Sequence, residues 1–214
     1  MKTISEIWNN DNLRCGGFYE LSIEVCDNKT IEPIKELVKT IFNLNFIKGP
    51  FTNDFEKTVL DLKYFENLGY IEIDNKQMPF KTFVINEEGE DGTIWLDVSI
   101  YTGILEEVLG NEFHTWSTDA KWHKGLDEQL ETILIETNAK FKVKSGMLGF
   151  EISGMYGLEW LKENELQGQD VSHSKFFVNN SDLERLSENN KIKIGEIKKQ
   201  KILASIIIVR SLLN

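Results

Sequence analysis

The stretch EFHTWSTDAKWH holds the side chains best suited to metal or acid–base chemistry. It brings His114, Asp119 and His123 close together in the chain, beside Trp116 and Trp122. Two imidazoles and a carboxylate can hold a transition metal if they converge on one point. Their spacing matches no helical H-x-x-x-H arrangement, so we expect a loop anchored by tryptophans and no metal site. A metal-binding enzyme built on residues 111–125 is the alternative.

Covalent and hydrolytic chemistry have weaker support in the sequence. The two cysteines, Cys15 and Cys26, have no histidine that the sequence places beside them, and free thiols are the simplest interpretation, with a disulfide as the alternative. Pairs of carboxylates could serve a hydrolase, but a chain with 35 acidic residues contains such pairs by chance. No G-x-G-x-x-G or P-loop pattern occurs. We therefore expect no catalytic residue and no cofactor, and a hydrolase stays open as an alternative.

Three stretches share an acid, an aliphatic residue and a serine: YELSIEV, WLDVSIY and GFEISGM. Each alternates like a strand, so the aliphatic residues predict one buried face, and the acids, serines and neighbouring aromatic residues share the other. We predict that this second face is open and binds a basic protein partner. Its residues are Phe18, Glu20, Ser22, Trp95, Asp97, Ser99 and Glu151. The alternative is a set of outward strand positions that are polar only because they face water.

The net charge of −11 is concentrated in one half of the chain. Residues 1–112 hold 21 Asp and Glu and 10 Lys and Arg, whereas residues 113–214 hold 14 of each kind. Binding to nucleic-acid phosphates needs Lys and Arg, so we expect no nucleic-acid partner. A basic protein would be attracted to the first half. The alternative is that acidity serves solubility alone.

Periodic apolar residues predict the elements that position these side chains. The stripe from Ile34 to Phe42 predicts a helix that Thr30 caps, and Asn53, Glu56 and Gly69 predict a second helix over 53–69. Further helices are expected at GILEEVLG and LDEQLETILIETN, with a hairpin over AKFKVKSGMLGFEISG that turns at Ser145–Gly146. Strands are expected at 70–74, 80–86 and 93–101, and at KFFV, KIKIGEI and ILASIIIV, with a turn over 86–92.

These elements favour an α+β fold with a mixed, mostly antiparallel sheet and amphipathic helices packed on one face, with two similar halves as an option. We expect a single domain over 1–214, with a two-part organisation into 1–112 and 113–214. The start of the chain lacks the apolar run of a signal peptide, and its most apolar stretch is too short to span a bilayer. We therefore expect a cytoplasmic protein with no membrane partner.

In size, acidity and the lack of an evident catalytic motif, the chain resembles the small, acidic, single-domain bacterial proteins that neutralise a toxin from the same strain. The resemblance implies a non-enzymatic protein-binding protein, an immunity-type inhibitor of a basic toxin. Two alternatives remain: a hydrolase or metal-binding enzyme that uses the acidic face and the 111–125 loop, and a structural homo-oligomer. An enzyme needs a concave pocket with converging polar groups, whereas a binding protein needs an exposed, complementary patch.

Overall fold

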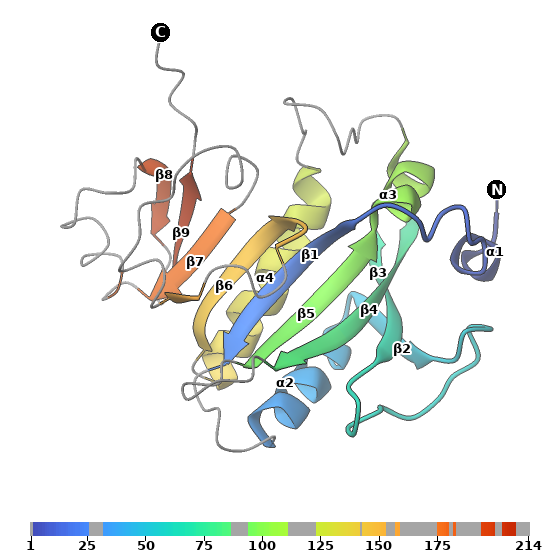
Figure 1. The fold of residues 1–214 in the computed structure, drawn as a ribbon, viewed down its shortest axis with the longest axis horizontal. Helices are drawn as coiled ribbons and strands as arrows, with labels where there is room; N and C mark the ends of the chain where they lie inside the picture. The colour runs from blue at the N-terminus through green and yellow to red at the C-terminus, as the bar shows by residue number, and fades with distance from the viewer. Residues whose placement is uncertain are drawn as a thin grey trace, which may run out of the picture.

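The computed structural model describes residues 2–25, 32–86, 94–110, 123–141, 143–152, 157–158, 175–179, 182, 194–199 and 203–208. These residues form four helices and nine strands (Figure 1). The helices are α1 (Ile4–Trp8), α2 (Glu32–Phe42), α3 (Thr102–Leu109) and α4 (Lys124–Lys140). The strands are β1 (Phe18–Val25), β2 (Ile47–Phe51), β3 (Asn67–Ile73), β4 (Lys76–Asn86), β5 (Ile94–Tyr101), β6 (Val143–Phe150), β7 (Lys175–Asn179), β8 (Ile194–Lys199) and β9 (Leu203–Ile208).

All nine strands belong to one antiparallel sheet, in the order β2-β3-β4-β5-β1-β6-β7-β9-β8. The first strand of the chain, β1, therefore lies at its centre. Its neighbours β5 and β6 come from either side of the 112/113 boundary, so the sheet runs across that boundary without a break. The predicted α+β fold with a mostly antiparallel sheet is confirmed.

Helices α2 and α4 lie behind the central strands in Figure 1 and cover one face of the sheet. Their apolar stripes are buried in the same core as alternate residues of β1 and β5, as the i, i+3, i+4 pattern predicts. Gly146 on β6 allows the close approach of α4, because a Cβ atom there would lie 2.8 Å from Leu134 Cδ2. The buried residues that share this interface include Leu21, Ile23, Ile34, Leu37, Val38, Ile41, Leu96, Val98, Leu126, Leu130, Ile133 and Leu134.

The predicted helix over 53–69 is wrong. Residues 52–66 form an irregular loop, and β3 begins at Asn67. Asn53, predicted as the helix cap, instead accepts a hydrogen bond from Trp8 Nε1 at 3.4 Å. Gly69, predicted as the helix stop, lies inside β3, where a Cβ atom would approach Phe80 Cζ to 2.8 Å. Tertiary contacts with α1 and β4 therefore override the local helical pattern.

The predicted hairpin turn at Ser145–Gly146 is also wrong, because β6 runs through both residues as one strand. Both residues are paired on both sides, with β1 and with β7. The strands predicted over 80–86, 93–101, KFFV, KIKIGEI and ILASIIIV correspond to β4, β5, β7, β8 and β9. The short helix α1, which the sequence reasoning missed, begins with a capping box between Thr3 and Glu6. The predicted cap Thr30, most of the 86–92 turn and most of the 111–125 loop lie outside the described residues.

Candidate functional site

Both faces of the central strand β1 carry buried polar side chains. Tyr19, Leu21 and Ile23 alternate with Glu20, Ser22 and Glu24, so the two sets point to opposite faces of the sheet. The first set faces the helices, and the second lies on the other face. Every one of these six side chains is buried. A charged group in such a position must be paired or hydrogen-bonded, so each face defines a candidate site.

The register of the sheet explains why two of the three similar stretches resemble each other. In the antiparallel pairing of β1 with β5, Glu20 lies opposite Ser99, and Ser22 lies opposite Asp97. Ser99 Oγ donates a hydrogen bond to Glu20 Oε2 at 3.1 Å. An acid–aliphatic–serine sequence on both strands thus places an acid opposite a serine at two adjacent positions of the same face. We refer to this face, with Glu24 and Ser145, as the acidic face.

Two residues that follow β6 in the chain, Ile152 and Leu158, contact the acidic face. The backbone N–H of Ile152 donates to Glu20 Oε1 at 2.8 Å, and that of Leu158 donates to Glu24 Oε2 at 2.8 Å. Ser145 Oγ donates to the same Glu24 oxygen at 2.6 Å, and Lys144 Nζ lies 3.6 Å from Glu24 Oε1. The carboxylates of Glu20 and Glu24 are therefore satisfied within the chain.

Of the residues predicted to bind a partner, most are closed off from solvent. Glu20, Ser22, Trp95, Asp97 and Ser99 are buried, with an exposed fraction of 3% or less. The expectation of an open face is wrong for these five side chains, and the backbone at Ile152 and Leu158 contacts Glu20 and Glu24 on the same face. Whether any of them contributes to partner binding stays a prediction.

The two remaining predicted residues lie at the edge of this face. Phe18 is half-buried against Tyr101 and Phe83, with ring centroids 4.7 and 6.2 Å away. Glu151 is exposed, and its Oε1 accepts a hydrogen bond from the backbone N–H of Phe18 at 2.6 Å. The third similar stretch thus ties the end of β6 to the start of β1. Its serine, Ser153, lies outside the described residues.

On the acidic face, Ser22 Oγ and Trp95 Nε1 are buried and have no hydrogen-bond partner among the described residues. An unsatisfied buried donor costs about 1–3 kcal/mol. The acidic face is therefore a polar interior layer in which the two glutamates are well satisfied and these two neighbours are not.

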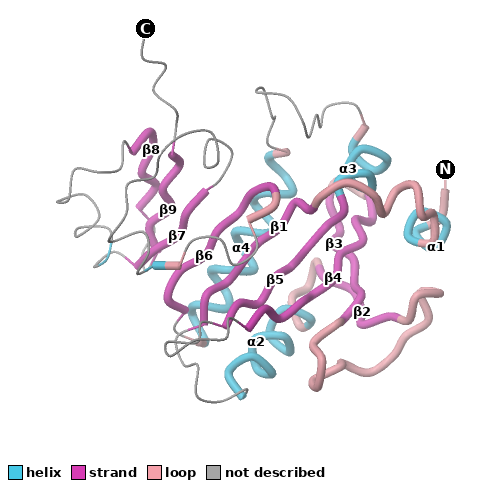
Figure 2. Tube along the Cα trace, in the orientation of Figure 1, coloured by secondary structure: helices cyan, strands magenta, loops and turns pink. Residues whose placement is uncertain are grey.

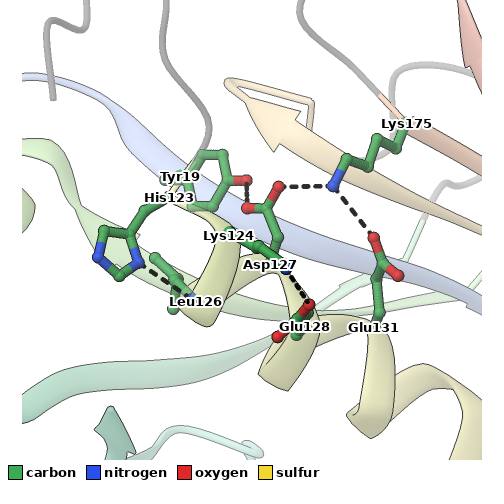
Figure 3. Close-up of polar contacts among 8 residues, drawn as sticks. All are labelled: Tyr19, His123, Lys124, Leu126, Asp127, Glu128, Glu131 and Lys175. Carbon is green, nitrogen blue, oxygen red and sulfur yellow. Dashed lines mark hydrogen bonds and ion pairs between the residues drawn. The ribbon is translucent and has the colours of Figure 1, made fainter. Parts of the chain in front are cut away.

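The opposite face of β1 carries a network of four side chains (Figure 3). The Tyr19 hydroxyl donates to Asp127 Oδ1, and Lys175 Nζ lies 2.5 Å from Asp127 Oδ2 and 3.0 Å from Glu131 Oε1. Asp127 and Glu131 come from α4, and Lys175 is the first residue of β7. The side chains of Asp127 and Lys175 are only 3% and 12% exposed. This network, named here the Tyr–Asp–Lys network, links β1, α4 and β7.

Burial and charge shift the pKa values in this network. Burial, reinforced by the Asp127 carboxylate, raises the pKa of Tyr19 well above that of a free tyrosine. Burial also raises the pKa of Asp127, although Lys175 and Tyr19 oppose that shift. Burial alone would lower the pKa of Lys175, but the charges and hydrogen bonds of Asp127 and Glu131 outweigh it, so the pKa of Lys175 is raised. Tyr19 is therefore a neutral donor at neutral pH, and Lys175 is a cation.

This arrangement can hold three elements together, but it offers little room for a reaction. Tyr19 and Asp127 are both buried, so a substrate could not reach them without a change in the packing of α4. The sequence reasoning missed the network. A signal was present, because Asp127 lies on the helix face that also carries Leu130 and Leu134. An acid in an apolar stripe needs a buried partner.

The residues singled out for metal or nucleophilic chemistry are placed only in part. His114, Asp119 and Cys26 lie outside the described residues. His123 caps α4, because its Nδ1 accepts the N–H of Leu126 at 3.2 Å. Cys15 is an exposed free thiol. Over the ranges that the structure describes, no three His, Cys, Asp or Glu residues are grouped so as to hold a metal ion.

A pocket lies between α1, α3 and the turn that joins β3 to β4. Its polar lining includes Lys2, Glu72, Asp74, Lys76 and Glu107, and Lys2 forms an ion pair with Glu107 at 2.8 Å. Its described lining residues carry both signs of charge and include no Ser, Cys or His that could act as a nucleophile or a near-neutral base. We therefore do not assign a reaction to it.

Comparison with known proteins leaves the fold and the site to be interpreted on their own terms. No family model, no curated protein and no solved structure matches this chain. Among the helices of the described ranges, none is both long enough and apolar enough to cross a membrane.

Proposed function

We propose that this chain is a non-enzymatic, cytoplasmic protein that binds a basic protein partner, as an immunity-type inhibitor would. The observation that carries the proposal is the distribution of charge. The whole net charge of −11 belongs to residues 1–112, and residues 113–214 are neutral in balance. A partner with a positive surface would therefore be drawn to one half of the chain.

The acidic residues of 1–112 include both buried and exposed side chains. Glu20, Glu24 and Asp97 are buried. Exposed acids therefore meet a partner first. They include Asp11, with 87% of its side chain exposed and an ion pair to Arg14, and Glu72, with 47% exposed and Lys48 Nζ 3.4 Å away. Rim charges of this kind mainly raise the association rate and confer specificity. We therefore expect a partner that binds fast at low salt.

The inner carboxylates also bear on the enzyme alternative. A carboxylate that acts as a general acid or base must reach the substrate within hydrogen-bonding distance. Glu20 and Glu24 are committed instead to Ser99, Ser145 and the backbone N–H groups of Ile152 and Leu158. This commitment supports a structural role for the acidic face and favours binding over hydrolysis.

The test begins with affinity purification of the protein from its native cells and identification of any bound protein. Association rates are then measured with the purified partner at about 10 mM and 150 mM salt, where the Debye length falls from about 30 to about 8 Å. The variant Asp11→Asn, Glu72→Gln should associate several-fold more slowly than the wild type at low salt, and the difference should shrink at high salt. The matched control is Glu128→Gln, Glu136→Gln, which removes two exposed charges from α4 in the neutral half.

An equal fall in the association rate of both variants would show that the attraction does not depend on which half of the chain carries the charges. A partner with an acidic or neutral surface would refute the proposal.

A further inference from the structure

The loop between β2 and β3, residues 52–66, displays the most exposed large apolar side chains of the described part of the chain. Val59 is 84% exposed and Tyr64 is 64% exposed. Figure 2 shows this loop extending from β2 at the edge of the molecule. Single exposed apolar residues are common on protein surfaces, but two on one long loop call for an explanation. We refer to residues 52–66 as the β2–β3 loop.

Hydrogen bonds fix the backbone of the β2–β3 loop close to Val59 and Tyr64, so the loop is ordered where these side chains are exposed. The backbone N–H of Thr58 donates to Pro50 O at 3.0 Å. Asp61 N donates to Asn67 Oδ1 at 2.7 Å, and Asn67 Nδ2 donates back to Asp61 O at 3.0 Å. These hydrogen bonds hold the backbone near Val59 and Tyr64 in place, which lowers the entropic cost of binding through this loop.

The backbone of the loop adopts conformations that bulky residues rarely take. Phe55 and Phe65 have φ angles of 61° and 62°, in the left-handed region. Phe65 is buried, and Phe55 packs against the ring of Phe51 with centroids 5.5 Å apart. The two phenylalanines thus anchor the loop inward while Val59 and Tyr64 remain outside. Unfavourable φ angles of this kind gather at functional sites.

The charge around these side chains favours a cationic partner. Asp54, Glu56 and Glu66 are exposed on the same loop, as are Lys57 and Lys63; with Asp61, the loop carries four acids and two lysines and so has a net negative charge. Lys63 Nζ lies 4.6 Å from the centroid of the Tyr64 ring. The Tyr64 ring thus already interacts with a cation of the same chain, and a partner's Arg or Lys would take the place of Lys63 on that ring face.

We propose that the β2–β3 loop is the docking surface for a basic protein, with Val59 and Tyr64 as the apolar anchors and the surrounding acids as the rim. This inference rests on the proposed function, and it specifies the surface that the partner contacts. Tyrosine is among the residues that most often dominate binding energy when an interface excludes water around them. The acids around it would select a positively charged patch with an apolar recess.

The first experiment places a photo-crosslinking amino acid at position 59 of the full chain in native cells. A matched control carries it at position 124 on α4, where the Lys124 side chain is 88% exposed. We expect a crosslinked basic protein from position 59 and none from position 124. Equal crosslinking from both positions, or crosslinking from 124 alone, would overturn the assignment of the surface.

The second experiment measures binding to the partner that crosslinking identifies, which is purified separately in its free form. The double variant Val59→Ser, Tyr64→Ser changes only exposed side chains, so its melting temperature should match that of the wild type. Its Kd should rise about 30-fold or more, the fold-change that marks a hot spot. The variant Asp11→Asn, Glu72→Gln should slow association and leave the dissociation rate unchanged.

The two proposals fail in different ways. If the double variant binds the basic partner as tightly as the wild type, the docking surface is wrong and the proposed function stands. If the wild type binds no basic protein, the proposed function is wrong and this inference fails with it.

Discussion

Replacing Lys175 with methionine should lower the free energy of unfolding by about 3–5 kcal/mol, the cost of leaving one member of a buried ion pair without its partner. Methionine keeps the length of the apolar stem and removes the ammonium group. The Asp127 side chain is 3% exposed and would then be left with the Tyr19 hydroxyl as its remaining partner in the Tyr–Asp–Lys network. The Asp127 carboxylate would then carry an unpaired charge in the apolar interior. Most of the lost free energy of unfolding comes from this unpaired charge.

The pH dependence of this variant gives a sharper test than its stability alone. Without Lys175, burial should raise the pKa of Asp127 further above the unfolded value of about 3.9. Between those two pKa values the folded state binds a proton that the unfolded state does not bind. The stability of the variant should therefore rise as the pH falls through the raised pKa of Asp127 towards the unfolded value, and the loss relative to the wild type should shrink.

Urea denaturation followed by tryptophan fluorescence, at several pH values between 5 and 8, measures both effects. The matched control is Asp127→Asn, which removes the charge and keeps an oxygen that accepts from Tyr19. The double variant Lys175→Met, Asp127→Asn should lose less stability than the sum of the two single losses, because the second change removes the stranded charge. A loss under about 0.5 kcal/mol for Lys175→Met, with no change between pH 5 and 8, would refute the reasoning.

Three further predictions follow from the described contacts. Glu20→Gln should destabilise the protein by about 1–3 kcal/mol, because an amide NH₂ would face the donors Ser99 Oγ or Ile152 N; an unchanged melting temperature would show that these bonds contribute little. Leu37→Ala or Ile41→Ala should cost about 2–5 kcal/mol in urea denaturation, since both side chains are fully buried between α2 and the sheet, and a loss below about 0.5 kcal/mol would place that face outside the core. Stability should fall as the pH rises above about 10, because the unfolded chain releases the tyrosine proton there while Tyr19 keeps its own; the variant Tyr19→Phe should show a smaller alkaline loss, and an equal loss would contradict the assigned pKa shift.

Periodicity predicted the parts of the fold that depend on one buried face. The stripe of α2, the alternation of β1 and the apolar side of α4 each bury the residues that their spacing indicates. The antiparallel α+β arrangement followed from hairpins and helices in sequence order. These features are local, so a single chain segment contains the information for them.

The errors arose where distant residues decide the local conformation. The β2–β3 loop has a helical pattern, but Trp8 Nε1 donates a hydrogen bond to Asn53, and the backbone N–H of Asn67 donates to Thr82 Oγ1 on β4. Ser145 and Gly146 have the composition of a turn, yet pairing with strands on both sides keeps them extended. Contacts between residues far apart in sequence leave no periodic trace.

The acidic face was also predicted only in part, because its burial depends on residues that are far apart in the sequence. Alternation correctly placed Glu20, Ser22 and Asp97 opposite the aliphatic residues, because the pleat requires it. It could not indicate that these side chains are buried, or that the backbone N–H groups of Ile152 and Leu158 bond to Glu20 and Glu24. The Tyr–Asp–Lys network was missed for a related reason, since Tyr19, Asp127 and Lys175 meet only after β1, α4 and β7 are packed.

The most direct test of the central proposal is the association rate of the purified protein with its purified partner as a function of salt. If the acidic half attracts a basic protein, the wild-type rate should fall by about tenfold or more between 10 and 150 mM salt, because screening shortens the range of attraction. The dissociation rate should change far less, since the apolar anchors of the β2–β3 loop set it. An association rate that is the same at both salt concentrations, or that rises with salt, would contradict the account.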